Sequence, residues 1–174
     1  MANWTLDNAH SEIEFKVRHM MISTVKGLFK SFDIRLESDS EDLSNAQVEV
    51  NIDVNSIDTK NEQRDQHLIS SDFFNTAEFP KITFKSTSIV KSTDDEFKIT
   101  GDLTIKGVTK SVTFDGEIGG VAKDPWGNLK AGYTVKGKIN RSDFGLSWNA
   151  TLETGGVMVS EEVKFTADVQ FVKA

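Results

Sequence analysis

Apolar and polar residues alternate over most of this chain, and three of the alternating segments carry a glycine on their apolar side. In the clearest segment, that side consists of Phe97, Ile99, Gly101, Leu103 and Ile105. A period of two is typical of an antiparallel sheet with one buried and one solvent-exposed face. A glycine on the buried face leaves a gap where another side chain would have packed. The pattern therefore predicts β-structure whose interior is not completely filled.

Seven further segments repeat this alternation, two of them with Gly116 and Gly137 on the apolar side: residues 11–18, 32–37, 48–55, 81–84, 112–118, 133–139 and 163–171. Strands at hairpin spacing with no regular helices between them predict an antiparallel barrel or a sandwich. Glycines on the inward side favour the barrel, because they relieve crowding at bends and eight strands enclose room for one small ligand. If the glycines only permit curvature, they do not require a cavity.

Three short segments interrupt the strands. Residues 61–75 have a helical pattern with Asn61 as a candidate N-cap, and residues 71–75 read as a second short helical turn. Residues 19–27 break the alternation, and Ser23 and Gly27 suit the two ends of about one helical turn. The sequence therefore predicts an all-β single domain over residues 1–174, an eight-stranded antiparallel barrel with one or two short helices.

The composition narrows the classes of partner. The chain has 20 basic and 27 acidic residues, a net charge of −7, and no cysteine. An acidic chain without a clustered basic face is unsuited to nucleic acid, and it has no basic run for an anionic membrane. No segment approaches the roughly 20 apolar residues needed to cross a bilayer, so stable membrane insertion is not expected. The N-terminus has no basic and apolar leader pattern, which predicts a cytoplasmic protein; removal of a leader is the alternative.

Catalytic and metal-binding patterns are not found in the sequence. His10, His19 and His67 lack the spacing of metal ligands, and no Gly-x-Ser-x-Gly motif marks an activated serine. The absence of cysteine excludes a thiolate nucleophile and disulfide bonds. We therefore predict no catalytic residue, no metal site and no cofactor.

The candidate ligand-binding residues are those on the inward side of the predicted strands, with two methionines beside the predicted bend. They are Phe15, Val17, Met20, Met21, Ile34, Val50, Ile52, Phe84 and Leu103. Ordinary core packing is the alternative for either methionine. Arg141 and Asp143 follow the third glycine segment, where the strand ends abruptly, and they are candidates for fixing a head group at the barrel mouth. A structural salt bridge or a loop clamp is the alternative for this pair.

Several motifs in a fixed order resemble the YceI-like family of lipocalin-like polyisoprenoid-binding proteins, almost from end to end. They are Trp4-x-Leu6-Asp7-x-x-His10-Ser11-x-Ile13-x-Phe15-x-Val17, His67-Leu68-x-Ser70-x-Asp72-Phe73-Phe74, Phe79-Pro80-x-Ile82-x-Phe84, Gly101-x-Leu103-Thr104-Ile105-x-Gly107-Val108-Thr109-Lys110, Asp124-Pro125-Trp126-Gly127, Arg141-x-Asp143-Phe144-Gly145 and Glu162-Val163.

The resemblance implies a lipocalin-like barrel whose internal hydrophobic tunnel takes a polyisoprenoid or a similar fatty amphiphile. Binding, transport or storage of such a molecule is the expected function, and a homodimer is compatible with the resemblance. Two alternatives stay open: a lipid-modifying or hydrolytic enzyme that uses the barrel as a substrate tunnel, and an interaction module whose barrel is filled.

Overall fold

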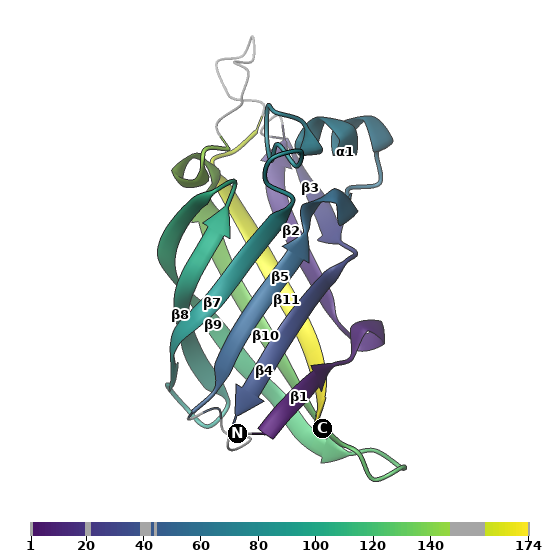
Figure 1. Cartoon of the computed structure of the whole chain (residues 1–174), viewed down its shortest axis with the longest axis vertical. Coiled ribbons are helices and arrows are strands. Elements are labelled where there is room, and N and C mark those ends of the chain that lie inside the picture. Colours follow the sequence, from purple (N-terminus) through teal and green to yellow (C-terminus); the bar gives the residue numbers. More distant parts are fainter. Residues whose placement is uncertain (1, 20–21, 39–42, 44, 147–158, 174) are drawn as a thin grey trace.

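The computed structural model describes residues 2–19, 22–38, 43, 45–146 and 159–173. Most of them lie in one antiparallel sheet (Figure 1). Its strands are β1 (Ala2–Leu6), β2 (Glu12–His19), β3 (Ser23–Phe29), β4 (Phe32–Ser38), β5 (Gln47–Asp53), β6 (Ile57–Asp58), β7 (Lys81–Lys91), β8 (Glu96–Ile105), β9 (Val108–Lys123), β10 (Leu129–Asn140) and β11 (Glu162–Lys173). The helices are α1 (Glu62–Ile69) and the single-turn η1 (Asn8–His10), η2 (Val54–Ser56) and η3 (Arg141–Phe144).

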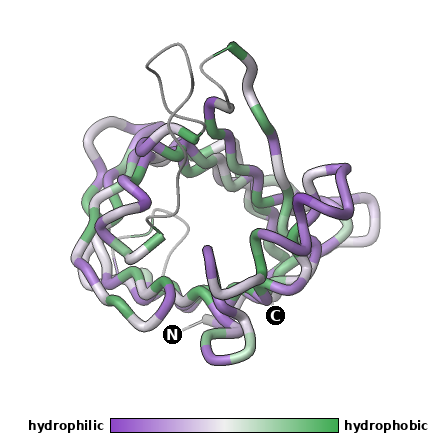
Figure 2. The backbone as a smooth tube through the Cα atoms, turned by 90° about the horizontal axis from the view of Figure 1, so that it is seen from above, coloured by the Kyte–Doolittle hydropathy of each residue, from purple (hydrophilic) through white to green (hydrophobic). Residues whose placement is uncertain are grey.

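Eight of these strands close into a barrel. They follow one another around the wall in the order β1, β4, β5, β7, β8, β9, β10 and β11, and β11 then pairs with β1. The closing register places Trp4 opposite Lys173 and Leu6 opposite Phe171. Viewed along its axis, the backbone is a closed ring in which hydrophobic and hydrophilic residues alternate (Figure 2). The predicted eight-stranded antiparallel barrel is confirmed.

Strands β2, β3 and β6 complete the wall at the end of the barrel near α1. Strand β2 pairs with the first half of β11, β3 pairs with β2, and β6 joins the end of β3. Strand β11 therefore has two partners on the same edge, β2 along its first half and β1 along its last residues. The three-residue helix η1 connects these two partners.

The helical turn predicted for residues 19–27 is wrong. Residues Ser23–Phe29 form strand β3, in register with β2, so that Phe15 lies opposite Gly27. The local capping signals of Ser23 and Gly27 are overridden by this strand pairing. A Cβ atom on Gly27 would collide with the ring of Phe15. Glycine is needed here because an aromatic ring from the neighbouring strand occupies the position of its side chain.

The three inward glycines of the sequence pattern have the same role, so the expected gaps beside them are not empty. A Cβ on Gly101 would lie 2.6 Å from Cζ of Phe84, and one on Gly137 would lie 2.8 Å from Cε1 of Phe165. Gly116 is covered in the same way by the ring of Phe97. Aromatic rings placed over glycines on neighbouring strands are a known means of stabilising strongly curved sheets.

Changing Gly137 to alanine is therefore expected to destabilise the protein. The added methyl group would displace a packed phenyl ring, which typically costs about 1–3 kcal/mol of unfolding free energy. Gly132→Ala is the matched control on the same strand, because its Cβ would meet nothing closer than 3.9 Å and should change stability by less than about 0.5 kcal/mol. Urea unfolding of the two variants checks this, and equal stabilities would contradict it.

Helix α1 lies over one end of the barrel (Figure 1). Asn61 caps it as predicted, with its side-chain oxygen accepting a hydrogen bond from the Arg64 backbone N–H at 3.0 Å. Buried Thr59 ties the helix to the wall, since its backbone N–H donates to the carboxylate of Asp65 at 2.9 Å and its hydroxyl accepts from Nε of Arg64 at 2.8 Å.

The second helical turn predicted for residues 71–75 is wrong, because these residues form hydrogen-bonded turns. Within the described residues, no helix is long and apolar enough to span a bilayer.

Candidate ligand-binding site

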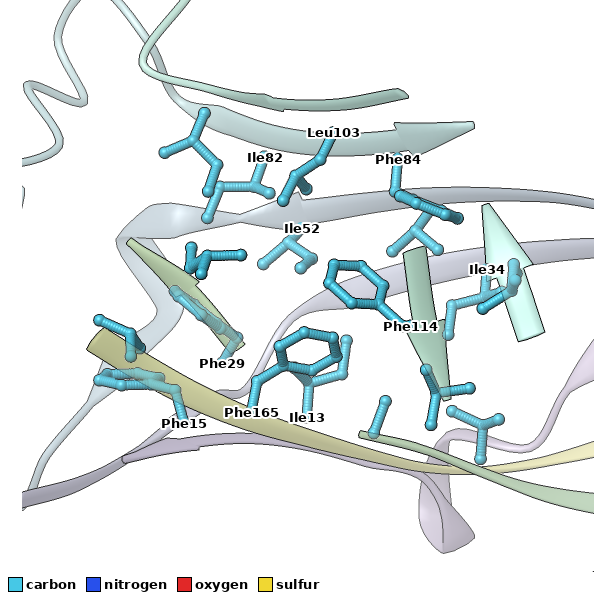
Figure 3. A pocket seen from close by; sticks show the side chains of 18 of the residues that line it. Ile13, Phe15, Phe29, Ile34, Ile52, Ile82, Phe84, Leu103, Phe114 and Phe165 are labelled. Atoms are coloured by element: carbon cyan, nitrogen blue, oxygen red, sulfur yellow. The ribbon is translucent and has the colours of Figure 1, made fainter. Parts of the chain in front are cut away.

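The barrel encloses a cavity of about 260 Å³ along its axis. Inward-facing side chains of nine strands, β2–β5 and β7–β11, form most of its wall, and Leu68, Phe73 and Phe74 of α1 and the following turns contribute at one end. Figure 3 shows aliphatic and aromatic side chains from opposite walls pointing toward one another. All described lining residues are apolar except Tyr133 and Arg141. The cavity is therefore suited to hydrocarbon.

Ten aromatic residues line this interior, and nine of them, all except Phe73, form three groups of contacting rings. Going from the α1 end to the far end, the groups are Phe15 with Phe29 and Phe74, Phe84 with Phe114 and Phe165, and Phe97 with Tyr133 and Phe171. The tightest pair is Phe114–Phe165, with ring centroids 4.6 Å apart and nearly perpendicular planes. Because the rings narrow the interior at three levels, its shape suits a flexible chain better than a rigid polycycle.

Most of the candidate residues from the sequence lie on this wall. The described ones that line the cavity are Phe15, Val17, Ile34, Val50, Ile52, Phe84, Leu103 and Arg141. Met20 and Met21 fall outside the described residues. Asp143 is exposed on η3 and does not line the cavity. The structure therefore separates Asp143 from Arg141, although the sequence placed both at the mouth.

Arg141 is buried at the edge of the cavity and holds neighbouring backbone segments together. Its guanidinium donates to the carbonyl oxygens of Leu146 at 2.6 Å, Ser160 at 2.9 Å and Val159 at 3.2 Å. Burial lowers the pKa of Arg141 from its usual value, and the nearby charge of Glu161 partly offsets this. An arginine pKa is high enough for the group to stay charged in spite of burial. This geometry is that of the loop clamp considered above.

The sequence did not single out several cavity residues. Ile13, Phe114 and Phe165 share the inward phase of their strands, so the alternation alone could have identified them. Leu68 and Phe74 could not be found in this way, because they come from α1 and the turns after it. Their position depends on how α1 is attached to the barrel, and no local pattern encodes that attachment.

Apart from Tyr133 and Arg141, the polar side chains of the described residues lie outside the cavity. His67 at the end of α1 is 2.9 Å from Asp72, measured from Nε2 to Oδ2, and both side chains are well exposed. Of the described residues, none form a group of three or more His, Asp or Glu side chains able to hold a metal ion. Among the described lining residues, Arg141 is the only one with a charged side chain.

Comparison with known proteins supports one family. The YceI-like domain matches residues 4–171. The UPF0312 protein SA2479 of Staphylococcus aureus strain N315 is 48% identical over 172 residues, which cover 98% of each chain. The crystal structure of the Campylobacter jejuni YCEI protein is 36% identical, with a TM-score of 0.80 and coverage of 98% of this chain and 97% of that one.

A more distant structure has the same fold. It is a polyisoprenoid binding domain from Saccharophagus degradans, with a TM-score of 0.71 and 98% coverage of both chains but only 14% sequence identity. The domain match and the closer relatives extend over the whole barrel, including the strands that form the cavity wall. On this evidence, the chain belongs to the YceI-like family.

Proposed function

We propose that this protein binds a polyisoprenoid or a similar long-chain amphiphile inside the barrel and serves to carry or store it. The observation that carries the proposal is the interior cavity, whose described wall is apolar apart from Tyr133 and Arg141. Tyr133 packs against Phe97 and Phe171, and Arg141 is engaged with backbone carbonyls. The fold shared with the polyisoprenoid binding domain of Saccharophagus degradans supports the same ligand class.

The energetics favour a hydrocarbon chain. Burying one methylene group contributes about 0.8 kcal/mol, so ten of them contribute about 8 kcal/mol before the cost of ordering the ligand. The cavity volume of about 260 Å³ lies just below the range for small-molecule sites, roughly 300–1,000 Å³. A slender, flexible chain therefore fits this interior better than a bulky ring system.

The described wall also favours binding over catalysis. Hydrolysis or modification of a bound lipid would need a nucleophile or a general acid and base within hydrogen-bond reach of the reacting atoms. Among the described lining residues there is no serine, threonine, histidine, aspartate or glutamate. The pair formed by His67 of α1 and Asp72 does not line the cavity, and both side chains are well exposed.

Native mass spectrometry of the protein purified from its own host tests this proposal. We expect a population carrying one noncovalent molecule with a long hydrocarbon or isoprenoid chain, which organic extraction releases and tandem mass spectrometry identifies. A protein that carries no lipid, and stays empty when incubated with polyprenols and fatty alcohols, would instead support an interaction module with a filled barrel.

A further inference from the structure

The barrel wall is interrupted at one place beside η1. Strand β4 pairs with β1 only over Leu36–Ser38, although β4 begins at Phe32. In the described sheet, the first residues of β4 pair with β5 on one edge, and no strand pairs with them on the opposite edge. Strand β3 ends nearby at Phe29 and is bonded there to β6. The chain crosses this interruption as η1, the purple turn that projects from the side of the barrel in Figure 1.

A recess of about 510 Å³ lies in this interruption on the outer surface. Its lining is mainly polar and comes from η1, the start of β2, the end of β3, the start of β4, the turn between β3 and β4, and β11. The residues are Asn8, Ala9, His10, Ser11, Glu12, Leu28, Phe29, Lys30, Phe32 and Asp168. The recess differs in character from the interior cavity, whose described wall is almost entirely apolar.

Phe29 is the only described residue that lines both the interior cavity and this recess. Its side chain is buried, and its ring contacts Phe15 and Phe74 at centroid distances of 5.3 and 6.5 Å. Phe29 is therefore the described residue at which the interior cavity and the recess adjoin. Elsewhere along the described barrel wall, hydrogen-bonded strand pairs would have to separate for a ligand to pass sideways, whereas beside η1 the first residues of β4 have no strand partner on the β1 edge.

We propose that this interruption is a lateral portal, gated by Phe29, through which a ligand enters and leaves and at which its polar end reaches water. The inference rests on the proposed function, since it assumes that a hydrocarbon chain occupies the interior. The portal places the apolar chain behind Phe29 and the polar end among the side chains of the recess.

The charges of the recess oppose an anionic polar end, and we assign an uncharged group, such as a hydroxyl or a ring carbonyl. Glu12 and Asp168 lie opposite each other on neighbouring strands and contribute two carboxylates. The cation of Lys30 is 3.0 Å from the carboxylate of Asp58 and is partly neutralised by it. A carboxylate or phosphate in the recess would face net negative charge, which opposes its binding.

Blocking the recess after loading tests the portal. The chain has no cysteine, so Ala9→Cys introduces a single labelling site on exposed η1, and Asp94→Cys in the exposed turn between β7 and β8 is the matched control. Each variant is loaded with parinaryl alcohol, a fluorescent 18-carbon polyene, and then labelled with a polyethylene glycol maleimide. Release into excess vesicles of phosphatidylcholine is followed by fluorescence.

We expect the label at position 9 to slow release at least tenfold and the label at position 94 to leave it unchanged. Equal release rates would overturn the portal. If neither variant binds parinaryl alcohol before labelling, the proposed function itself fails, so the two failures are distinguishable. Parinaric acid has the same chain with a carboxylate, and we expect it to bind at least tenfold more weakly than the alcohol at pH 8. Equal or tighter binding of the acid would overturn the assignment of an uncharged polar end.

Discussion

Replacing Arg141 with methionine is expected to lower the free energy of unfolding by about 3 kcal/mol, which is roughly 10 °C in melting temperature for a chain of this size. Methionine keeps much of the side-chain volume but donates no hydrogen bond. The carbonyl groups of Leu146, Val159 and Ser160 would each lose a donor beside an apolar cavity. A buried carbonyl left without a partner costs about 1–3 kcal/mol, and part of this loss is relieved by local rearrangement.

A control variant separates the loss of the hydrogen bonds of Arg141 from the general effect of removing a positive charge. Arg35 lies on β4 with an exposed side chain, and its nearest carboxylate oxygens are 4.0 Å away on Glu37 and Glu49. Arg35→Met should therefore change stability by less than about 0.5 kcal/mol. Urea unfolding at pH 7 compares both variants with the parent. Equal destabilisation of the two would show that Arg141 has no special role in holding the backbone.

The strands could be predicted from the sequence because most of them have one dry and one wet face. The alternation of apolar and polar residues can be read from a short stretch of sequence, and residues such as Phe97 and Ile99 are buried as this alternation predicts. Residues 19–27 were wrongly predicted because Ser23 and Gly27 carry capping signals, while the actual constraint on Gly27 is the ring of Phe15 on the neighbouring strand. Contacts between strands are not visible in local periodicity.

The residues of the candidate site likewise divide into those that local alternation could identify and those that depend on contacts between distant segments. The inward phase identified wall residues such as Ile34, Val50 and Phe84, since alternation determines which face a side chain occupies. It could not identify the part of the wall formed by α1, or the ring of Phe29 at the interruption beside η1. Both depend on how segments far apart in the sequence meet in the barrel.

Filling the interior with an indole is expected to abolish most ligand binding. Val135 lies on β10 opposite Ala167 and Gly116, and its side chain lines the cavity. In Val135→Trp the larger side chain would occupy space that we assign to the ligand, and we expect affinity for a long-chain alcohol to fall at least tenfold, or about 1.4 kcal/mol. Lys136→Trp is the matched control, because the neighbouring side chain points to solvent.

Calorimetric titration with 1-alkanols of increasing length tests the central claim most directly. If the chain lies in the apolar interior, each added methylene should strengthen binding to the parent about fourfold, corresponding to about 0.8 kcal/mol, until the cavity is full. In the Val135→Trp variant this increase should stop at a shorter chain, while Lys136→Trp should follow the parent. An affinity independent of chain length, or the same limit in all three proteins, would contradict a ligand inside the barrel.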